Sequence, residues 1–406
     1  MYWMPDHFAN SVLTILAALA LSVVLFHPRV VASKNWRATV TPLASIIGSG
    51  FLVVGPILLR HFGDRAVFIM AGLCLLSYAI GGAVRFNIRA FGDAAESTLD
   101  GVQEKLETAS SWALSFAYVV SVCYYLNLFG AFAVSLTDLN DAMHGRLVTT
   151  AVLVFIGALG WTRGLRGLER AEELSVAVKL SVIAGLLVGM TYYAIELAID
   201  GGMPRNGLHV ESNSLRVAMG LLITVQGFET SRYLSEEYDA GTRVRTMRWA
   251  QWIATAIYIS YTGLASMEFT ATSFGARETA IIQMTQQVAP VLPMLLVVAA
   301  LAAQFSAAVA DTNGCGGLAR EVSSGRISSR SAYVMLSVFG IALTWSADVY
   351  RIIGYASRVF AVYYALQCAQ AAALSRLQAG FSPRTLGFAL LAIFAASIAV
   401  FGISPE

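Results

Sequence analysis

Long apolar blocks, separated by short polar stretches, run along the whole chain. Most blocks hold roughly the 20 residues that a helix needs to cross the hydrocarbon core of a bilayer. The pattern therefore predicts an all-α, polytopic membrane protein with about twelve transmembrane helices. The predicted spans are residues 10–26, 41–60, 66–86, 112–135, 147–161, 174–195, 215–234, 249–268, 290–314, 331–346, 350–374 and 385–402.

The composition agrees with this pattern. The 406 residues are 57% hydrophobic and 13% charged, whereas a soluble domain has about a quarter of its residues charged, so a soluble globular domain is excluded. A net charge of +2 gives no polybasic field for nucleic acid. No cleavable signal is expected, because the first ten residues lack a basic region.

Cysteine and histidine give no sign of a metal site, a cofactor or a catalytic base. The four cysteines stand singly in apolar surroundings, and the five histidines fall in loops or at their edges. We therefore expect no metal, no cofactor and no enzymatic activity. A sensor is disfavoured as well, because there is no soluble output domain.

Positive charges alternate between the loops. One set of loops holds 17 Lys and Arg residues and the opposite set holds 6. Since Lys and Arg gather on the cytoplasmic side, this predicts an inner-membrane protein with both termini on the outer side. The longest polar stretch, residues 87–111, is expected to be a solvated amphipathic connector.

The span at 41–60 carries Gly48, Ser49 and Gly50 at its middle. Glycine lets the backbone leave the helix and present free N–H and C=O groups, which lipid tolerates only beside a cavity. The alternative is a small-residue face on which another helix packs closely.

A second interruption is predicted in the span at 215–234, where Gln226, Gly227 and Glu229 lie at the centre. This span comes five helices later and runs in the opposite direction. Two broken helices at corresponding positions of oppositely oriented halves indicate an inverted-repeat transporter with its site at the midplane.

At these residues the chain resembles the amino acid-polyamine-organocation (APC) superfamily. The matching features are IGSG at 47–50, the aromatic residues Trp112, Tyr118, Tyr124 and Tyr125, VKL at 178–180, and GFE at 227–229 followed by a Glu pair and Arg243. The resemblance implies a leucine-transporter-type 5+5 fold that moves an amino acid or an organic amine.

The predicted organisation follows from this resemblance. Residues 1–40 form an extra helix and a cytoplasmic loop, residues 41–374 a ten-helix core with repeats at 41–195 and 215–374, and residues 375–406 a last helix. The extra first helix and the single helix after the core depart from the family, as does Gln226 before GFE. The extra helix is interpreted as either a homodimer contact or a packing addition.

The expected substrate cradle joins the two interruptions. An amino acid's carboxylate would meet the amides of the first break, and its ammonium would meet the opened carbonyls of both. Aromatic residues near the midplane, Tyr124, Tyr125, Phe228 and Tyr355, are candidates to occlude it, with helix packing as the alternative for the tyrosines. The candidate residues are Ser45, Gly48, Ser49, Gly50, Gln226, Gly227, Phe228, Glu229 and Tyr124.

Charged residues inside the spans are candidates for ion coupling, because each costs about 2.5–3.5 kcal/mol at the bilayer centre. By resemblance, Lys179 takes the place of a sodium ion, and the alternative is a lysine that snorkels to the interface. Asp311, with Thr312 and Asn313, either pairs with Lys179 or binds a cation directly. The coupling ion is therefore a proton in the favoured interpretation and sodium in the other.

Glu229 has three interpretations. It recognises a substrate ammonium, carries a proton, or forms a structural salt bridge with Arg232 or Arg358. Arg358 lies deep enough in its span to be more than a surface charge. The sequence therefore predicts a secondary transporter of an amino acid or small organic amine, working by alternating access with proton coupling or exchange. An inorganic-cation transporter of the same fold is the alternative.

Overall fold

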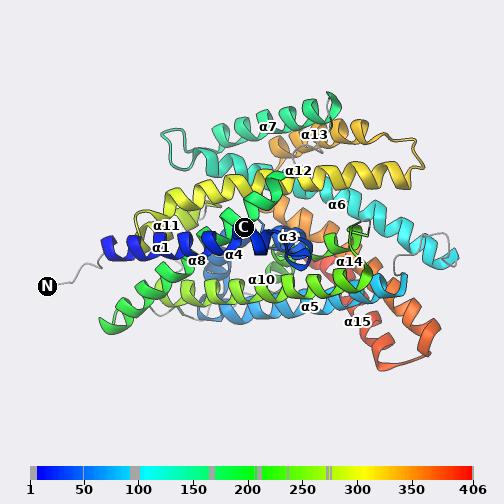
Figure 1. The fold of residues 1–406 in the computed structure, drawn as a ribbon, viewed down its shortest axis with the longest axis horizontal. Coiled ribbons are helices and arrows are strands. Elements are labelled where there is room, and N and C mark those ends of the chain that lie inside the picture. The colour runs from blue at the N-terminus through cyan, green and yellow to red at the C-terminus, as the bar shows by residue number, and fades with distance from the viewer. Residues whose placement is uncertain are drawn as a thin grey trace.

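The computed structural model describes residues 7–48, 50–91, 101–162, 164, 170–204, 206–207, 213–235, 237–270, 274 and 277–404. Within these residues every regular element is a helix (Figure 1). The longer helices are α1 (His7–Leu25), α3 (Lys34–Ile46), α4 (Gly50–Phe62), α5 (Ala66–Phe91), α6 (Gly101–Val134), α7 (Ala142–Thr162), α8 (Arg170–Ile199), α10 (Ala240–Glu268), α12 (Leu292–Val322), α13 (Ser329–Ser346), α14 (Val349–Ala379) and α15 (Pro383–Phe401). The shorter ones are α2 (Pro28–Val31), η1 (Gly63–Arg65), α9 (Ser214–Gly220), η4 (Leu222–Val225), η5 (Phe228–Tyr233) and α11 (Ala280–Val288).

Each predicted span coincides with a helix or with an interrupted helix. Seven segments of the described chain are long and apolar enough to cross a membrane, and one of them, Gly50–Phe91, combines α4, η1 and α5. The chain is therefore an all-helical protein of the multi-pass kind. A count of twelve crossings and the inverted repeat stay predictions.

The helices pack around α6, which contacts α7, α12 and α14. On another side of the molecule α10 packs against α5 and α3, and α8 packs against α12. In Figure 1, α7 and α13 lie along one edge, and α5 and α10 along the other. The residues between these layers include the side chains with the least exposure, among them Tyr124, Phe228 and Tyr258.

Helix α1 packs on α8, and this contact depends on small residues. A Cβ atom at Gly185 would lie 2.7 Å from the carbonyl oxygen of Thr14, so only glycine permits this approach. The side chain of Asn10 donates to the carbonyls of Gly189 (3.2 Å) and Val288 (2.8 Å). The first helix is therefore a packing addition, while its opposite face, with Leu16 and Val23 exposed, leaves the dimer interpretation a prediction.

The predicted connector at 87–111 is wrong in one respect. Helix α5 continues to Phe91, and α6 begins at Gly101 and runs without interruption into the predicted span. Glu107 is only 6% exposed and is therefore not solvated. Residues 92–100 lie outside the described residues.

Candidate functional site

The first interruption separates α3 from α4. Helix α3 ends at Ile46, Ile47 leaves the helical conformation at ψ 60°, and α4 begins at Gly50. The N–H of Ile47 still donates to the carbonyl of Leu43, which closes the last turn of α3. The predicted break is therefore confirmed, although Ser49 itself lies outside the described residues.

The second interruption is longer. Helix α9 ends at Gly220 and is followed by η4, the extended residue Gln226 and Gly227, whose φ is 115°. A positive φ of this size is easily adopted only by glycine. The predicted break is confirmed, and the described residues from 221 to 239 contain no α-helix before α10 begins at Ala240.

The two interruptions lie against each other. A Cβ atom at Gly227 would lie 2.5 Å from the carbonyl carbon of Ser45, and one at Gly50 would lie 2.8 Å from Cα of Thr224. The two backbones therefore touch at the points where the sequence places glycine. The predicted cradle residues Ser45, Gly50 and Gly227 thus lie together, although the two segments are about 180 residues apart in the sequence.

Polar side chains from neighbouring helices satisfy the unwound backbone. The hydroxyl of Tyr258, from α10, lies at hydrogen-bond distance from the carbonyl of Ile46 in one break (2.9 Å) and of Thr224 in the other (2.5 Å). Ser357, from α14, donates to the carbonyl of Gly220 (2.5 Å) and accepts from the N–H of Ile223 (3.0 Å). Because an unpaired peptide group costs several kcal/mol in lipid, these helices make the breaks tolerable.

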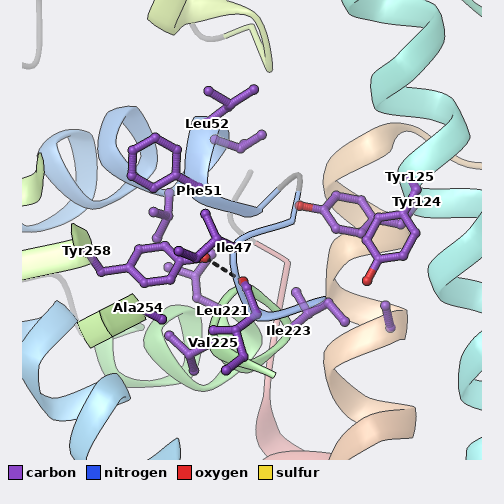
Figure 2. Packing of buried hydrophobic residues seen from close by; sticks show 14 of the residues in the cluster. Ile47, Phe51, Leu52, Tyr124, Tyr125, Leu221, Ile223, Val225, Ala254 and Tyr258 are labelled. Carbon is purple, nitrogen blue, oxygen red and sulfur yellow. Dashed lines mark hydrogen bonds between the residues drawn. The ribbon is translucent and has the colours of Figure 1, made fainter. Parts of the chain in front are cut away.

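Two tyrosines of α6 face the break from the side opposite Tyr258, as Figure 2 shows. The side-chain amide of Gln226 donates to the hydroxyl of Tyr125 (3.3 Å), and a Cβ atom at Gly48 would lie 3.8 Å from the Tyr125 ring. Tyr124 lies beside Tyr125, with ring centroids 5.5 Å apart. The structure therefore places Gly48, Gln226 and the tyrosine pair in one buried cluster.

Tyr355 does not belong to this cluster. It is 43% exposed and lines a different pocket with Arg358 and residues of the C-terminal segment. Tyr355 was expected near the midplane because of its position within its predicted span, which does not say which side of the helix it is on. The prediction that it occludes the site is wrong.

Glu229 is fully buried at the start of η5. Its Oε2 atom accepts from the N–H of Gly227 (2.9 Å) and from the hydroxyl of Tyr364 (2.7 Å). Phe228, the preceding residue, stacks on the Tyr364 ring with centroids 5.2 Å apart. The structure thus attaches Glu229 and Phe228 to α14.

The salt-bridge interpretations of Glu229 are wrong within the described residues. Arg232 pairs with Glu107 at 2.5 Å, whereas the carboxylate of Glu229 accepts from Gly227 and Tyr364. Arg358 is exposed and donates to the carbonyl of Ala399 (2.8 Å). Arg358 is therefore a surface charge, and the expectation that it is more than that is wrong.

Two acceptor atoms at the second break have no hydrogen-bond donor among the described residues. They are Oε1 of Gln226 and Oε1 of Glu229, in side chains that are 2% and 0% exposed. Buried polar atoms are almost always paired, so an orphaned acceptor beside a broken helix marks a place where a donor from outside the chain can bind.

The predicted coupling residues contact several different neighbours. Lys179 is 6% exposed and donates to the carbonyl of Ala44 in α3 (2.9 Å), so it does not snorkel to the interface. The hydroxyl of Ser121 in α6 donates to the carboxylate of Asp311. The hydroxyl of Tyr333 in α13 donates to the side chain of Asn313 (3.3 Å).

Thr312 uses its hydroxyl within its own helix, where it donates to the carbonyl of Ala308 (2.6 Å). Because α12 is continuous, successive residues point about 100° apart, and Asp311, Thr312 and Asn313 do not share one face. In the described part of the chain no group of three His, Cys, Asp or Glu side chains lies close enough to hold a metal ion.

A buried polar network that the sequence analysis missed lies next to η5. Besides pairing with Glu107, Arg232 donates to the side chain of Gln367, which in turn donates to Ser110 (2.9 Å). Gln370 donates to Glu107 (3.0 Å). The signal was present in the sequence, since Glu107, Ser110 and Ser111 continue the buried face of the following span at helical spacing.

Comparison with known proteins agrees with a membrane protein that has interrupted helices. The chain matches a family model described as an APC superfamily transporter over residues 28–402. A protein of Aquifex aeolicus (strain VF5), described as an uncharacterized protein, is 43% identical over 340 residues, which cover 82% of this chain and 83% of that protein.

The helical, multi-pass architecture with this family match defines a membrane transporter. The chain belongs to the APC superfamily of transporters. The family match begins at residue 28, after α1, in agreement with the extra first helix.

Proposed function

We propose that the protein is a secondary transporter that carries an amino acid or a small organic amine through the junction of the two interrupted helices. The observation that carries the proposal is the pair of orphaned acceptors, Gln226 Oε1 and Glu229 Oε1, at the contact between the two breaks. A substrate ammonium supplies the donors that these atoms lack, and its positive charge complements the carboxylate.

The substrate carboxylate binds on the other side of the junction. Helix α4 is 13 residues long and starts at Gly50, so its first amides and the positive end of its dipole point into the break. Gly48 and Gly50 add no side chain of their own to this backbone, although Thr224 packs against Gly50 in the unliganded chain. A zwitterionic amino acid therefore matches the charges at both ends of the cradle, with Tyr124 and Phe228 closing over it.

Lys179 links the cradle to an ion gradient in this proposal. Its ammonium holds the carbonyl of Ala44 in α3, one residue before Ser45. Loss of a proton from Lys179 removes the charge from this hydrogen bond and loosens α3 at the break. Proton binding and alternating access are coupled in this way, with Asp311 as the carboxylate that pairs with Lys179.

The membrane arrangement is part of the same proposal. The excess of Lys and Arg in alternate loops supports an inner-membrane protein with both termini outside. The contact between oppositely oriented breaks supports a 5+5 inverted repeat with residues 41–195 and 215–374 as its halves.

Uptake by proteoliposomes tests the proposal. Radiolabelled amino acids and amines are offered one at a time to vesicles with an imposed proton gradient and potassium in place of sodium. We expect accumulation of at least one compound, its loss on adding a protonophore, and at least a tenfold lower rate for Glu229→Gln and Lys179→Ala. Lys34→Ala, which removes an exposed lysine, is the matched control and transports normally. Strict sodium dependence overturns the proton coupling, and normal transport by Glu229→Gln removes this residue from the cradle.

A further inference from the structure

A separate cavity, with several charged side chains in its lining, lies at the end of α6 that the charge pattern places outside. It has a volume of about 250 Å³ and lies between the end of α6, the start of α7, the segment before α11 and the link between α13 and α14. This is smaller than the roughly 300–1,000 Å³ of pockets for drug-sized ligands, so it suits a molecule of a few heavy atoms.

The floor of this cavity connects it with the proposed cradle. Asn127 lines the cavity, is 6% exposed and lies one helical turn beyond Tyr124 on α6, a rise of about 4.5 Å. The side-chain amide of Asn127 donates to Thr344 (2.9 Å) and to the carbonyl of Cys123 (2.8 Å), but no described residue donates to its Oδ1 atom. A ligand in the cavity therefore meets a fixed, unused acceptor directly above the cradle.

Two of the cavity's carboxylates are already occupied. Asp141 accepts from the N–H of His144 (2.9 Å) and contacts the His144 ring (2.6 Å), and these bonds lower the pKa of its carboxyl. Asp348 caps α14 by accepting from the N–H of Arg351 (2.9 Å) and also contacts the Arg351 guanidinium (3.2 Å). Neither carboxylate is the counter-ion of an arginine that lines the cavity.

The other charged groups are unused. Among the described residues, the side chain of Arg146 makes no hydrogen bond or ion pair, and neither does that of Glu278. In the described part of the chain, the Arg277 side chain donates to the carbonyl of Asn140 (3.3 Å) and to no other group. The cavity thus offers two guanidinium groups and one carboxylate, none of which forms an ion pair with a described residue.

We propose that this cavity is an outer binding site for the zwitterion of a small α-amino acid, which holds the substrate before it enters the cradle. The substrate carboxylate lies between Arg146 and Arg277, whose planar donors fit it, and the ammonium faces Glu278 and Asn127 Oδ1. The identity of the ligand rests on the proposed function, whereas the cavity and its charges do not.

Protection of an introduced thiol tests this site. All four native cysteines are buried, so Ala142→Cys places an exposed thiol on the cavity wall against a silent background. Purified protein in detergent is treated with a charged thiol reagent in the presence of L-alanine, propionate or ethylamine. We expect L-alanine to slow the reaction at millimolar concentration, and propionate and ethylamine, which carry one charge each, to need at least tenfold more.

Further substitutions in the Ala142→Cys protein identify the groups responsible. Arg146→Gln and Arg277→Gln raise the half-protecting concentration of L-alanine at least tenfold, whereas Arg65→Gln, an exposed arginine outside the cavity, leaves it unchanged. Glu229→Gln also leaves it unchanged, because protection comes from the cavity and not from the cradle.

Absence of protection at 100 mM L-alanine, equal protection without the two arginines, or protection that disappears with Glu229→Gln would each overturn the outer site. Transport is measured separately on the protein without the introduced thiol. Transport without protection rejects the outer site alone, and protection without transport of any amino acid rejects the proposed function alone.

Discussion

The buried pair of Arg232 and Glu107 gives the sharpest prediction about how the second interruption is held. Arg232 lies in η5, and its side chain is 13% exposed; the Glu107 side chain is 8% exposed. Their contact fixes the end of the broken helix to α6, and the bond from Arg232 to Gln367 fixes it to α14. Removing one partner leaves the other charge buried.

Arg232→Met is the perturbation. Breaking a buried pair typically costs 3–5 kcal/mol, and we expect about 3 kcal/mol because Glu107 keeps its bond from Gln370. At about 2 °C per kcal/mol, the melting temperature falls by about 6 °C. Glu107→Gln costs at least as much, because the remaining guanidinium cannot lose its proton.

Thermal unfolding of the purified protein in detergent, followed by tryptophan fluorescence, measures these changes. The double variant Glu107→Gln with Arg232→Met loses about 2 kcal/mol less than the sum of the two single losses, because neither charge is left alone. Lys34→Ala, which removes an exposed partner of Asp239, is the control and leaves the melting temperature unchanged. Single losses below about 1 kcal/mol that simply add would refute the assignment of this pair as the anchor of η5.

Three further predictions concern single positions. Gly227→Ala, at φ 115° and against Ser45, loses about 2 kcal/mol of stability or more and lowers uptake, whereas the same change at Gly317, in open space inside α12, is neutral or stabilises by up to about 1 kcal/mol. Equal losses in thermal unfolding would contradict the close approach. Tyr258→Phe removes the one hydroxyl proton that the carbonyls of Ile46 and Thr224 share and costs about 1–3 kcal/mol in the same assay, and an unchanged melting temperature would contradict the bridge. Hydrogen bonds from Thr242 lower the pKa of Asp239 to about 2. The Asp239 cap on α10 is therefore intact above about pH 4 and is lost as the pH falls towards 2. Asp239→Ser, whose hydroxyl caps the helix without titrating, should remove this part of the acid unfolding profile.

Much of the fold followed from hydropathy alone. In lipid every backbone N–H and C=O group needs a hydrogen-bond partner, and an apolar block of about 20 residues satisfies this requirement as a helix. The two interruptions were also predictable, since Gly50 and Gly227 interrupt apolar spans where a Cβ atom would clash with the facing backbone. Their mutual contact needed the structure, because it joins distant segments.

The partners of the charged residues were not predictable. Arg232 and Glu229 are three residues apart, and local spacing favoured a pair between them. The structure instead pairs Arg232 with Glu107, because α6 extends its buried face beyond the hydrophobic span. Glu229 accepts from Gly227 and Tyr364. The predictions for Tyr355 and Arg358 were wrong for a related reason. The position of a residue along a helix does not say whether its face packs against a neighbouring helix.

A structure of the protein with its transported compound bound, determined by electron cryomicroscopy, shows whether the junction of the two interruptions is the transport site. The compound is the one that the uptake screen identifies. We expect density between the start of α4 and residues 226–229, with the ligand's nitrogen within about 3.2 Å of Glu229 or of an opened carbonyl. Density confined to another part of the molecule, with the two interruptions packed against each other as in the unliganded chain, would contradict this expectation.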